Sequence, residues 1–129
     1  MAVVITMTGA SQSGKSTIGH IFLKQKNDNF NPIIFKKYTT RPPRENDDVI
    51  CVEKIPDKCD LVYEQYGVRY GLEFAKIYQH LQKGESSIIV LNYVRAIDDV
   101  RIALGPQVIS LFIYRMMPNR KLFASIEKE

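Results

Sequence analysis

Short apolar runs alternate along the chain with stretches in which apolar residues recur at helical spacing. The apolar runs are rich in β-branched side chains and are bounded by polar or turn-forming residues, so we expect buried strands. They cover residues 3–8, 33–38, 87–91 and 108–113. Helical spacing is found in residues 17–24, 72–83 and 94–104. This order predicts an α/β protein with a mainly parallel sheet and helices on its faces.

The stretch 39–70 follows a different pattern. Prolines and charges are frequent there, and its few apolar positions are compatible with short strands or with surface hairpins. We therefore expect one domain over residues 1–129, with a core formed by 1–38 and 71–129 and a small lobe over about 39–70. The length and the 45% share of hydrophobic residues suit a single hydrophobic core.

The segment 9–17 lies between the first strand and the first helix and fits the pattern G-x-x-x-x-G-K-[ST] at every specified position. Its residues are Gly9, Ala10, Ser11, Gln12, Ser13, Gly14, Lys15, Ser16 and Thr17. The two glycines let backbone N–H groups point inward, and with the helix N-terminus these donors form a concave anion site. In such a loop the lysine reaches the β and γ phosphates, and the hydroxyl ligates Mg²⁺. We therefore expect a P-loop that binds nucleotide phosphates, with Lys15 and Ser16 in these roles.

Composition and charge narrow the function only slightly. The formal net charge of +4 favours polyanionic ligands, but the basic residues are scattered, so we do not expect nucleic-acid binding. The spacing of Cys51 and Cys59 does not match a zinc site, and we interpret them, with His20 and His80, as ordinary residues without a disulfide. The N-terminal apolar run is too short to span a membrane, and we expect a cytoplasmic protein.

A second group of cations follows the second predicted strand, in residues 36–44. Two prolines there favour polyproline II, which has about three residues per turn, so Arg41 and Arg44 point to the same side. Two guanidinium groups on one side form a clamp for a doubly charged phosphate, although a solvated basic loop has the same composition. Because a P-loop precedes it, we interpret this segment as the phosphate site of an acceptor.

Together these motifs resemble those of the guanylate kinase family. The P-loop G-A-S-Q-S-G-K-S-T is followed by T-T-R-P-P-R, then by G-V-R-Y-G before a helix that ends in glycine. The resemblance implies a P-loop NTPase-like fold in which ATP binds with Mg²⁺ and phosphate passes to GMP, forming GDP. It implies that Arg41, Arg44 and Tyr70 bind the acceptor phosphate. The catalytic candidates are Lys15, Arg41 and Arg44.

The positions that would recognise the base depart from the family pattern. Lys37 and Leu72 stand where hydroxyl residues are expected. Either Asp60 or Glu64 could replace a glutamate that accepts hydrogen bonds from guanine, although solvated loop acids would look the same. We therefore keep other phosphorylated acceptors open, such as another nucleotide or a ribose bisphosphate.

Further departures concern single polar residues. Asn92 follows the third core strand, where nucleotide kinases commonly place a carboxylate, and we expect Asp98 and Asp99 to be solvent-facing helix charges. The linker in the lobe lacks the family's phosphate-binding tyrosine, for which Tyr63 and Tyr66 are candidates.

The family pattern continues into a lid helix that carries arginines and then into a closing helix, whereas this sequence ends at Glu129. Arg115, Arg120 and Lys121 are the late cations available. Arginines around a transferring phosphoryl group contribute about 10³ or more in rate. The alternatives are therefore a binding module that keeps the fold without turnover, or a partner chain, as in a homodimer, that completes the site.

Overall fold

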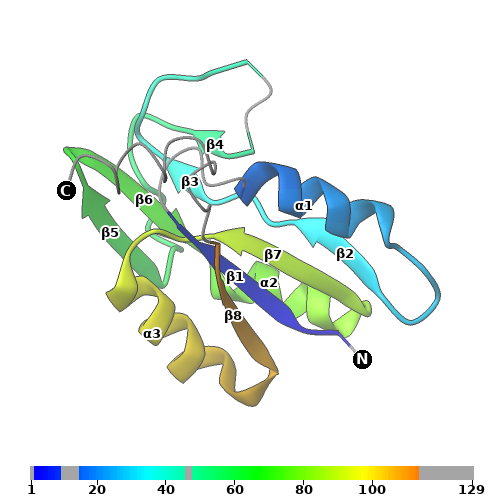
Figure 1. The fold of residues 1–129 in the computed structure, drawn as a ribbon. Helices are drawn as coiled ribbons and strands as arrows, with labels where there is room; N and C mark the ends of the chain where they lie inside the picture. Colours follow the sequence, from blue (N-terminus) through cyan, green and yellow to red (C-terminus); the bar gives the residue numbers. More distant parts are fainter. Residues whose placement is uncertain (1, 10–14, 46–47, 114–129) are drawn as a thin grey trace, which may run out of the picture.

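The computed structural model describes residues 2–9, 15–45 and 48–113, apart from the Ser16 side chain. Figure 1 shows a central sheet with helices around it and a smaller sheet beside it. The elements in chain order are β1 Val4–Thr8, α1 Lys15–Lys24, β2 Asn31–Ile34, β3 Tyr38–Thr39, β4 Ile50–Cys51, β5 Leu61–Gln65, β6 Val68–Leu72, α2 Phe74–Gln82, β7 Glu85–Val90, α3 Val94–Leu104, the 3₁₀ turn Gly105–Gln107 and β8 Val108–Phe112.

Four parallel strands form the central sheet, in the order β2-β7-β1-β8. β1 lies between β7 and β8, so that Val4 stands opposite both Ser87 and Val108. Because every pairing in this sheet is parallel, the carboxyl ends of its strands lie along one edge. In open α/β sheets, ligands bind outside this edge.

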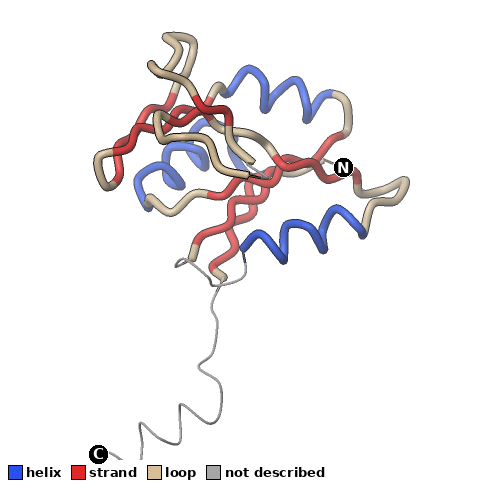
Figure 2. Tube along the Cα trace, turned by 90° about the horizontal axis from the view of Figure 1, so that it is seen from above, coloured by secondary structure: helices blue, strands red, loops and turns tan. Residues whose placement is uncertain are grey.

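Alternate residues of β1 face different helices. Ile5 and Met7 belong to an apolar cluster that includes Ile18 of α1. Val4 belongs to a second cluster, which contains the buried residues of α2 and α3: Ile77, Ala96, Val100 and Leu104. The sheet is therefore covered on both faces, by α1 on one and by α2 and α3 on the other (Figure 2). Burial on both faces explains why the core strands are almost continuously apolar.

The structure confirms the predicted α/β class and most of the predicted elements. The strands expected at 3–8, 87–91 and 108–113 correspond to β1, β7 and β8, and the helix expected at 94–104 is α3. This helix ends before Gly105, whose φ of 75° lies in the left-handed region that glycine adopts without steric cost. Apolar periodicity and a glycine stop signal were sufficient for these assignments.

Two predicted boundaries are wrong. The strand expected at 33–38 leaves the central sheet after Ile34, because the Lys37 carbonyl oxygen already accepts a hydrogen bond from the Ile50 N–H of the smaller sheet at 2.9 Å. The helix expected at 72–83 begins later, at Phe74, because Leu72 is the last residue of β6. In both cases, residues that we assigned to a core element from the sequence pair with the smaller sheet instead.

The smaller sheet has the order β4-β3-β6-β5. β5 and β6 form a hairpin in which Tyr63 stands opposite Tyr70. Its turn residues Tyr66 and Gly67 both have positive φ, 53° and 76°, as a two-residue hairpin loop of the tightest kind requires. Gly71 lets loop 52–60 approach closely, since a Cβ atom there would lie 2.5 Å from Ile55 Cγ2. The hairpin thus brings two tyrosines of the lobe side by side.

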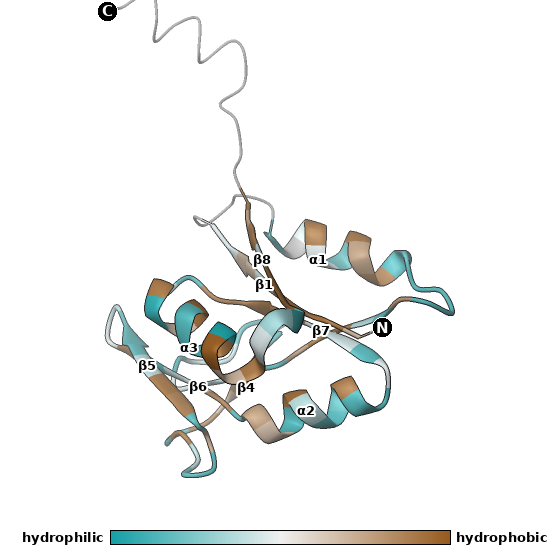
Figure 3. Ribbon diagram, turned by 90° about the horizontal axis from the view of Figure 1, so that it is seen from below, coloured by the Kyte–Doolittle hydropathy of each residue, from teal (hydrophilic) through white to brown (hydrophobic). Residues whose placement is uncertain are grey.

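The surface of the domain is mixed in character. Figure 3 shows largely hydrophobic central strands between helices that carry both hydrophilic and hydrophobic residues. Ile102 of α3 and Phe112 of the edge strand β8 are exposed, at 83% and 72%. Within the described ranges, no helix has the length and apolar character needed to cross a membrane.

Candidate functional site

The predicted P-loop begins at the carboxyl end of β1, beside the end of β7. The Thr8 hydroxyl donates a hydrogen bond to the Leu91 carbonyl oxygen at 2.7 Å. The Gly9 N–H donates to Oδ1 of Asn92 at 3.2 Å. Asn92, which stands where nucleotide kinases commonly carry a carboxylate, therefore holds the start of the loop against the neighbouring strand.

Lys15 is the first residue of α1, and its ammonium group donates a hydrogen bond to the Gly9 carbonyl oxygen. This contact joins the two ends of the segment 9–17. Burial lowers the pKa of Lys15 from its ordinary value. A cation beside a helix N-terminus, at the carboxyl end of a parallel strand, is placed to attract an anion.

Several residues of the expected donor site lie outside the described part of the chain. They are Ala10, Ser11, Gln12, Ser13, Gly14 and the side chain of Ser16. Thr17 is described and is exposed on α1. The late cations Arg115, Arg120 and Lys121 also lie outside the described residues. Phosphate binding by the loop and Mg²⁺ binding by Ser16 therefore stay predictions from the motif.

Lys37 extends from the segment between β2 and β3 to the end of β7. Its Nζ atom donates hydrogen bonds to the Val90 carbonyl oxygen at 2.5 Å and to the Tyr63 hydroxyl at 3.3 Å. The same atom lies 4.8 Å from the ring centroid of Tyr70, within the range of a cation–π interaction. Lys37 therefore joins the central sheet to the β5–β6 hairpin.

Three tyrosines form the aromatic wall beside this lysine. The Tyr63 and Tyr70 rings stack with centroids 5.2 Å apart and an interplanar angle of 18°. The Tyr93 ring, at the start of α3, has its centroid 5.4 Å from that of Tyr63, with an interplanar angle of 48°. Burial raises the pKa of Tyr63 above its ordinary value, so its hydroxyl stays protonated at neutral pH. The wall thus combines apolar ring faces with a buried hydroxyl.

The charges of both expected phosphate sites act on Lys37. Burial of the ammonium group lowers the pKa of Lys37 from 10.5 to about 8. Asp48 raises this pKa, whereas the positive charges of Arg41 and Lys15 lower it. No local sequence pattern indicates that these residues influence one another, because they are far apart in the chain.

The Arg41 segment is fastened to the β5–β6 hairpin. The Thr40 N–H donates to the Arg69 carbonyl oxygen at 3.0 Å, and the Arg69 N–H donates to the Thr40 hydroxyl at 3.0 Å. Arg41 is half-buried, and its guanidinium group donates to the Pro42 carbonyl oxygen at 3.0 Å. Arg44 is exposed in the same segment. The structure thus fastens the Arg41 segment to the hairpin that carries Tyr70, and the shared clamp of Arg41 and Arg44 stays a prediction.

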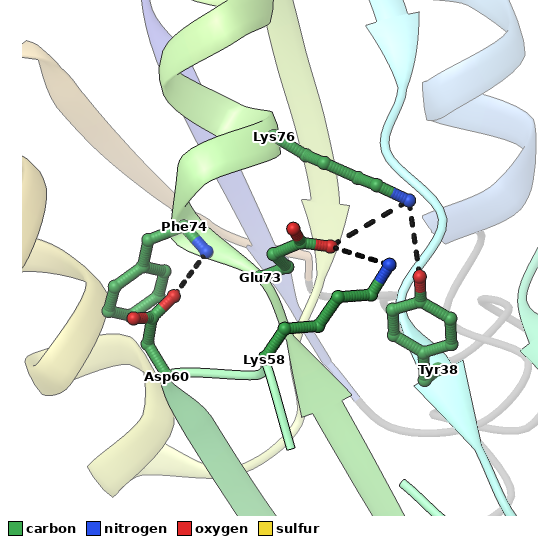
Figure 4. Close-up of polar contacts among 6 residues, drawn as sticks. All are labelled: Tyr38, Lys58, Asp60, Glu73, Phe74 and Lys76. Carbon is green, nitrogen blue, oxygen red and sulfur yellow. Dashed lines mark hydrogen bonds and ion pairs between the residues drawn. The ribbon is translucent and has the colours of Figure 1, made fainter. Parts of the chain in front are cut away.

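Asp60 has a structural contact in this fold (Figure 4). Its carboxylate accepts a hydrogen bond at 2.8 Å from the backbone N–H of Phe74, the first residue of α2. Such a contact satisfies one of the N–H groups that a helix start leaves without an intrahelical partner. The expected role of Asp60 in recognising a base stays a prediction, and capping of α2 is the role that its geometry gives it.

Next to this cap, Figure 4 shows an ionic cluster around Glu73. The Glu73 Oε2 atom lies 3.6 Å from the ammonium group of Lys58 and 3.7 Å from that of Lys76. The Lys76 ammonium also donates to the Tyr38 hydroxyl at 3.1 Å. These contacts connect the start of α2 to β3 and to the loop before β5. Lys58 and Lys76 therefore have a structural role in this junction.

Glu64 and Leu72 are the other two base-reading candidates. Glu64 is exposed on β5 and lines a surface groove of about 350 Å³ together with Tyr63, Tyr93 and Arg95. Tyr63, the preceding residue of the strand, is buried. Leu72 is fully buried in the cluster beneath α2 and α3. The position after the Tyr-Gly step therefore contributes to the core in this protein.

The remaining candidates behave as ordinary residues. Asp98 and Asp99 are exposed on α3, as expected. Cys51 and Cys59 are thiols and form no disulfide with each other. Over the ranges that the structure covers, no group of three or more histidine, cysteine or carboxylate side chains is arranged to hold a metal ion.

Comparisons with known proteins show the fold. No family model matches the chain, and no curated protein sequence matches it. The solved structure of a guanylate kinase from Anaplasma phagocytophilum is similar, with a TM-score of 0.65 over 86% of this chain at 18% sequence identity. This chain covers 58% of that protein's chain. The protein therefore has a nucleotide kinase-like α/β fold.

Proposed function

We propose that this protein is a P-loop kinase that transfers the γ-phosphoryl group of ATP to the phosphate of a nucleoside monophosphate. GMP, with GDP as the product, is the acceptor that the sequence resemblance implies. The observation that carries the proposal is the position of the predicted P-loop: Gly9 follows β1, Lys15 starts α1 and contacts the Gly9 carbonyl oxygen, at the carboxyl edge of a parallel sheet. Ligands bind outside this edge in open α/β sheets, which supports a nucleotide site there.

In this proposal each residue binds or orients a phosphate. Lys15 would hold the β and γ phosphates of ATP, while Arg41, Arg44 and Tyr70 would hold the acceptor phosphate. Mg²⁺, bound with ATP at Ser16, would supply charge neutralisation at the phosphate oxygens. Phosphoryl transfer needs positioning and electrostatic stabilisation rather than a protein nucleophile, which agrees with a cluster made of cations.

The same proposal assigns the two sheets to the two substrates. The core, residues 1–38 and 71–129, would bind ATP, and the lobe over about 39–70 would bind the acceptor. We further propose that the protein works in the cytoplasm and binds no nucleic acid. We also propose a homodimer as its assembly.

A second candidate acceptor is favoured by two side chains. Lys37 and Leu72 occupy the expected base-reading positions, the first as a buried cation and the second as a core residue. Neither supplies the hydroxyl of the family pattern. These positions favour another phosphorylated acceptor, such as a different nucleotide or a ribose bisphosphate, over GMP.

A coupled assay of ADP formation tests the kinase proposal. The purified protein is given Mg²⁺ and ATP with GMP, AMP, CMP, UMP or ribose 1,5-bisphosphate, and ATP affinity is measured separately by calorimetry. We expect ADP release that depends on one of these acceptors. ATP binding without ADP from any of them would show a binding module that keeps the fold without turnover.

A further inference from the structure

The first residue of the predicted P-loop is held by side chains through both of its peptide groups. The Gly9 N–H donates to Oδ1 of Asn92 at 3.2 Å, and the Gly9 carbonyl oxygen accepts a hydrogen bond from the Lys15 ammonium group. Glycine has more backbone freedom than any other residue, so its peptide groups turn easily where nothing holds them. These two contacts therefore fix the direction in which the chain leaves β1.

Asn92 reaches Gly9 because the ends of β7 and β1 are fastened to each other. The Leu91 N–H donates to the Met7 carbonyl oxygen at 2.9 Å, and the Leu91 carbonyl oxygen accepts a bond from the Thr8 hydroxyl at 2.7 Å. Asn92 itself is exposed, so packing in the core does not determine where its side chain points. Its hydrogen bonds have to do so.

A second contact of Asn92 comes from the lobe. The Gln65 side chain donates through Nε2 to the Asn92 carbonyl oxygen at 3.3 Å. Gln65 is the last residue of β5, directly before the turn of the β5–β6 hairpin. A backbone carbonyl oxygen only accepts and a backbone N–H only donates, so the orientation of both side-chain amides follows from their partners. Asn92 therefore connects the hairpin to Gly9.

The hairpin is in turn fastened to the segment that contains the expected acceptor clamp. The Thr40 N–H donates to the Arg69 carbonyl oxygen, and the Arg69 N–H donates to the Thr40 hydroxyl, each at 3.0 Å. Arg69 belongs to β6, which pairs with the strand that ends at Gln65. The lobe is thus joined to the start of the predicted P-loop by hydrogen bonds between described residues.

We propose that Gln65 and Asn92 are positioning residues through which the lobe orients the P-loop for ATP. Asn92 holds Gly9 directly, and Gln65 acts through Asn92. A loop that is already held in its binding conformation loses less conformational freedom when the ligand binds. A hydrogen bond made by the lobe therefore strengthens ATP binding by the core. This inference rests on the proposed kinase function, in which the loop binds the ATP phosphates.

Calorimetry with Mg²⁺ and ATP, in the absence of any acceptor, tests the proposal. Asn92→Ala should bind ATP about fivefold more weakly than the wild type, because the Gly9 N–H loses its partner. Gln65→Met keeps the length of the side chain but has no donor, and it should bind ATP about threefold more weakly. An unchanged ATP affinity in either variant would overturn the proposal. If Asn92→Ala does not fold, Gln65→Met decides alone.

A double variant shows whether the two residues act in series. Because Gln65 acts through Asn92, the combination of Gln65→Met with Asn92→Ala should bind ATP no more weakly than Asn92→Ala alone, whereas independent effects would multiply. Gln79→Met, exposed on α2, and Asn29→Ala, exposed before the amino end of β2, are the matched controls and should stay within about twofold of the wild type. Multiplied losses, or equal losses in the controls, would contradict the assignment.

The formation of ADP separates this inference from the kinase proposal. If ATP affinity depends on Gln65 but no acceptor supports ADP formation, the positioning role stands and the kinase function fails. If ADP forms and Gln65→Met leaves the ATP affinity unchanged, the kinase function stands and the positioning role fails.

Discussion

Single side chains at the carboxyl edge of the central sheet are the candidates for binding the two substrates of the proposed reaction. Lys15 starts α1 and contacts Gly9, while Lys37 is held by the Val90 carbonyl and the Tyr63 hydroxyl. The resulting site is strongly cationic. We therefore expect charge-removing substitutions to weaken binding of one substrate much more than the other, according to the phosphate that each residue would hold.

Replacing Lys15 with Ala should affect the donor side. We expect kcat/KM for ATP to fall at least about 100-fold, because the removed cation would stabilise charge on the transferring phosphoryl group. Calorimetry should show acceptor affinity within about threefold of the wild type. Lys24→Ala, at the exposed end of the same helix, is the control. An unaltered ATP affinity and rate in Lys15→Ala would remove the P-loop assignment.

Replacing Arg41 with Ala should have the reverse effect. The acceptor KM is expected to rise about tenfold or more while the ATP KM changes little, since a charge-assisted bond to the acceptor phosphate is lost. Arg95→Ala, at an exposed position of α3, should change neither the acceptor KM nor the ATP KM. Equal increases in both KM values for Arg41→Ala would show that it does not belong to an acceptor site.

At the scale of elements, the start of α2 is fixed from outside the helix. Asp60 accepts a bond from Phe74, and Glu73 lies between the ammonium groups of Lys58 and Lys76 (Figure 4). This junction connects the loop before β5 to the helix that follows β6. This junction therefore fixes the β5–β6 hairpin, which carries Tyr63 and Tyr70, relative to α2.

Asp60→Ala should lower the free energy of unfolding by about 1 kcal/mol, as removal of a helix-capping group does. Urea denaturation measures the change. Asp60→Asn should lose less, and Asp57→Ala, at an exposed neighbouring position, should change stability little. A large rise in the GMP KM of Asp60→Ala with no loss of stability would instead support a role in recognising the base.

The sequence predicts the core elements well and the lobe poorly, for a physical reason. Buried parallel strands and α3 carry continuous or periodic apolar patterns that depend on neighbouring residues alone. The change from β2 to β3 is decided by pairing with distant strands, which no local pattern shows. Likewise, Lys37 contacts Tyr63 and Val90, which lie 26 and 53 positions away in the chain. The sequence therefore could not predict these contacts.

At the scale of the whole molecule, the fold brings the two expected phosphate sites to one edge of the parallel sheet. The P-loop start follows β1, and the Arg41 segment follows the short connection from β2. The chain covers 58% of the chain of the similar guanylate kinase. Transfer between the two sites is the property that this arrangement supports.

The most direct measurement of that transfer follows the phosphoryl group itself. The protein is incubated with Mg²⁺ and γ-³²P-ATP, with GMP or ribose 1,5-bisphosphate as the acceptor, and the products are separated by chromatography. We expect the label in a new phosphoanhydride on the acceptor, either in GDP or in a ribose that carries one diphosphate and one monophosphate group. With Lys15→Ala, we expect this label to form at least about 100-fold more slowly. Label found in ATP and inorganic phosphate alone, whichever acceptor is present, would contradict phosphoryl transfer by this protein.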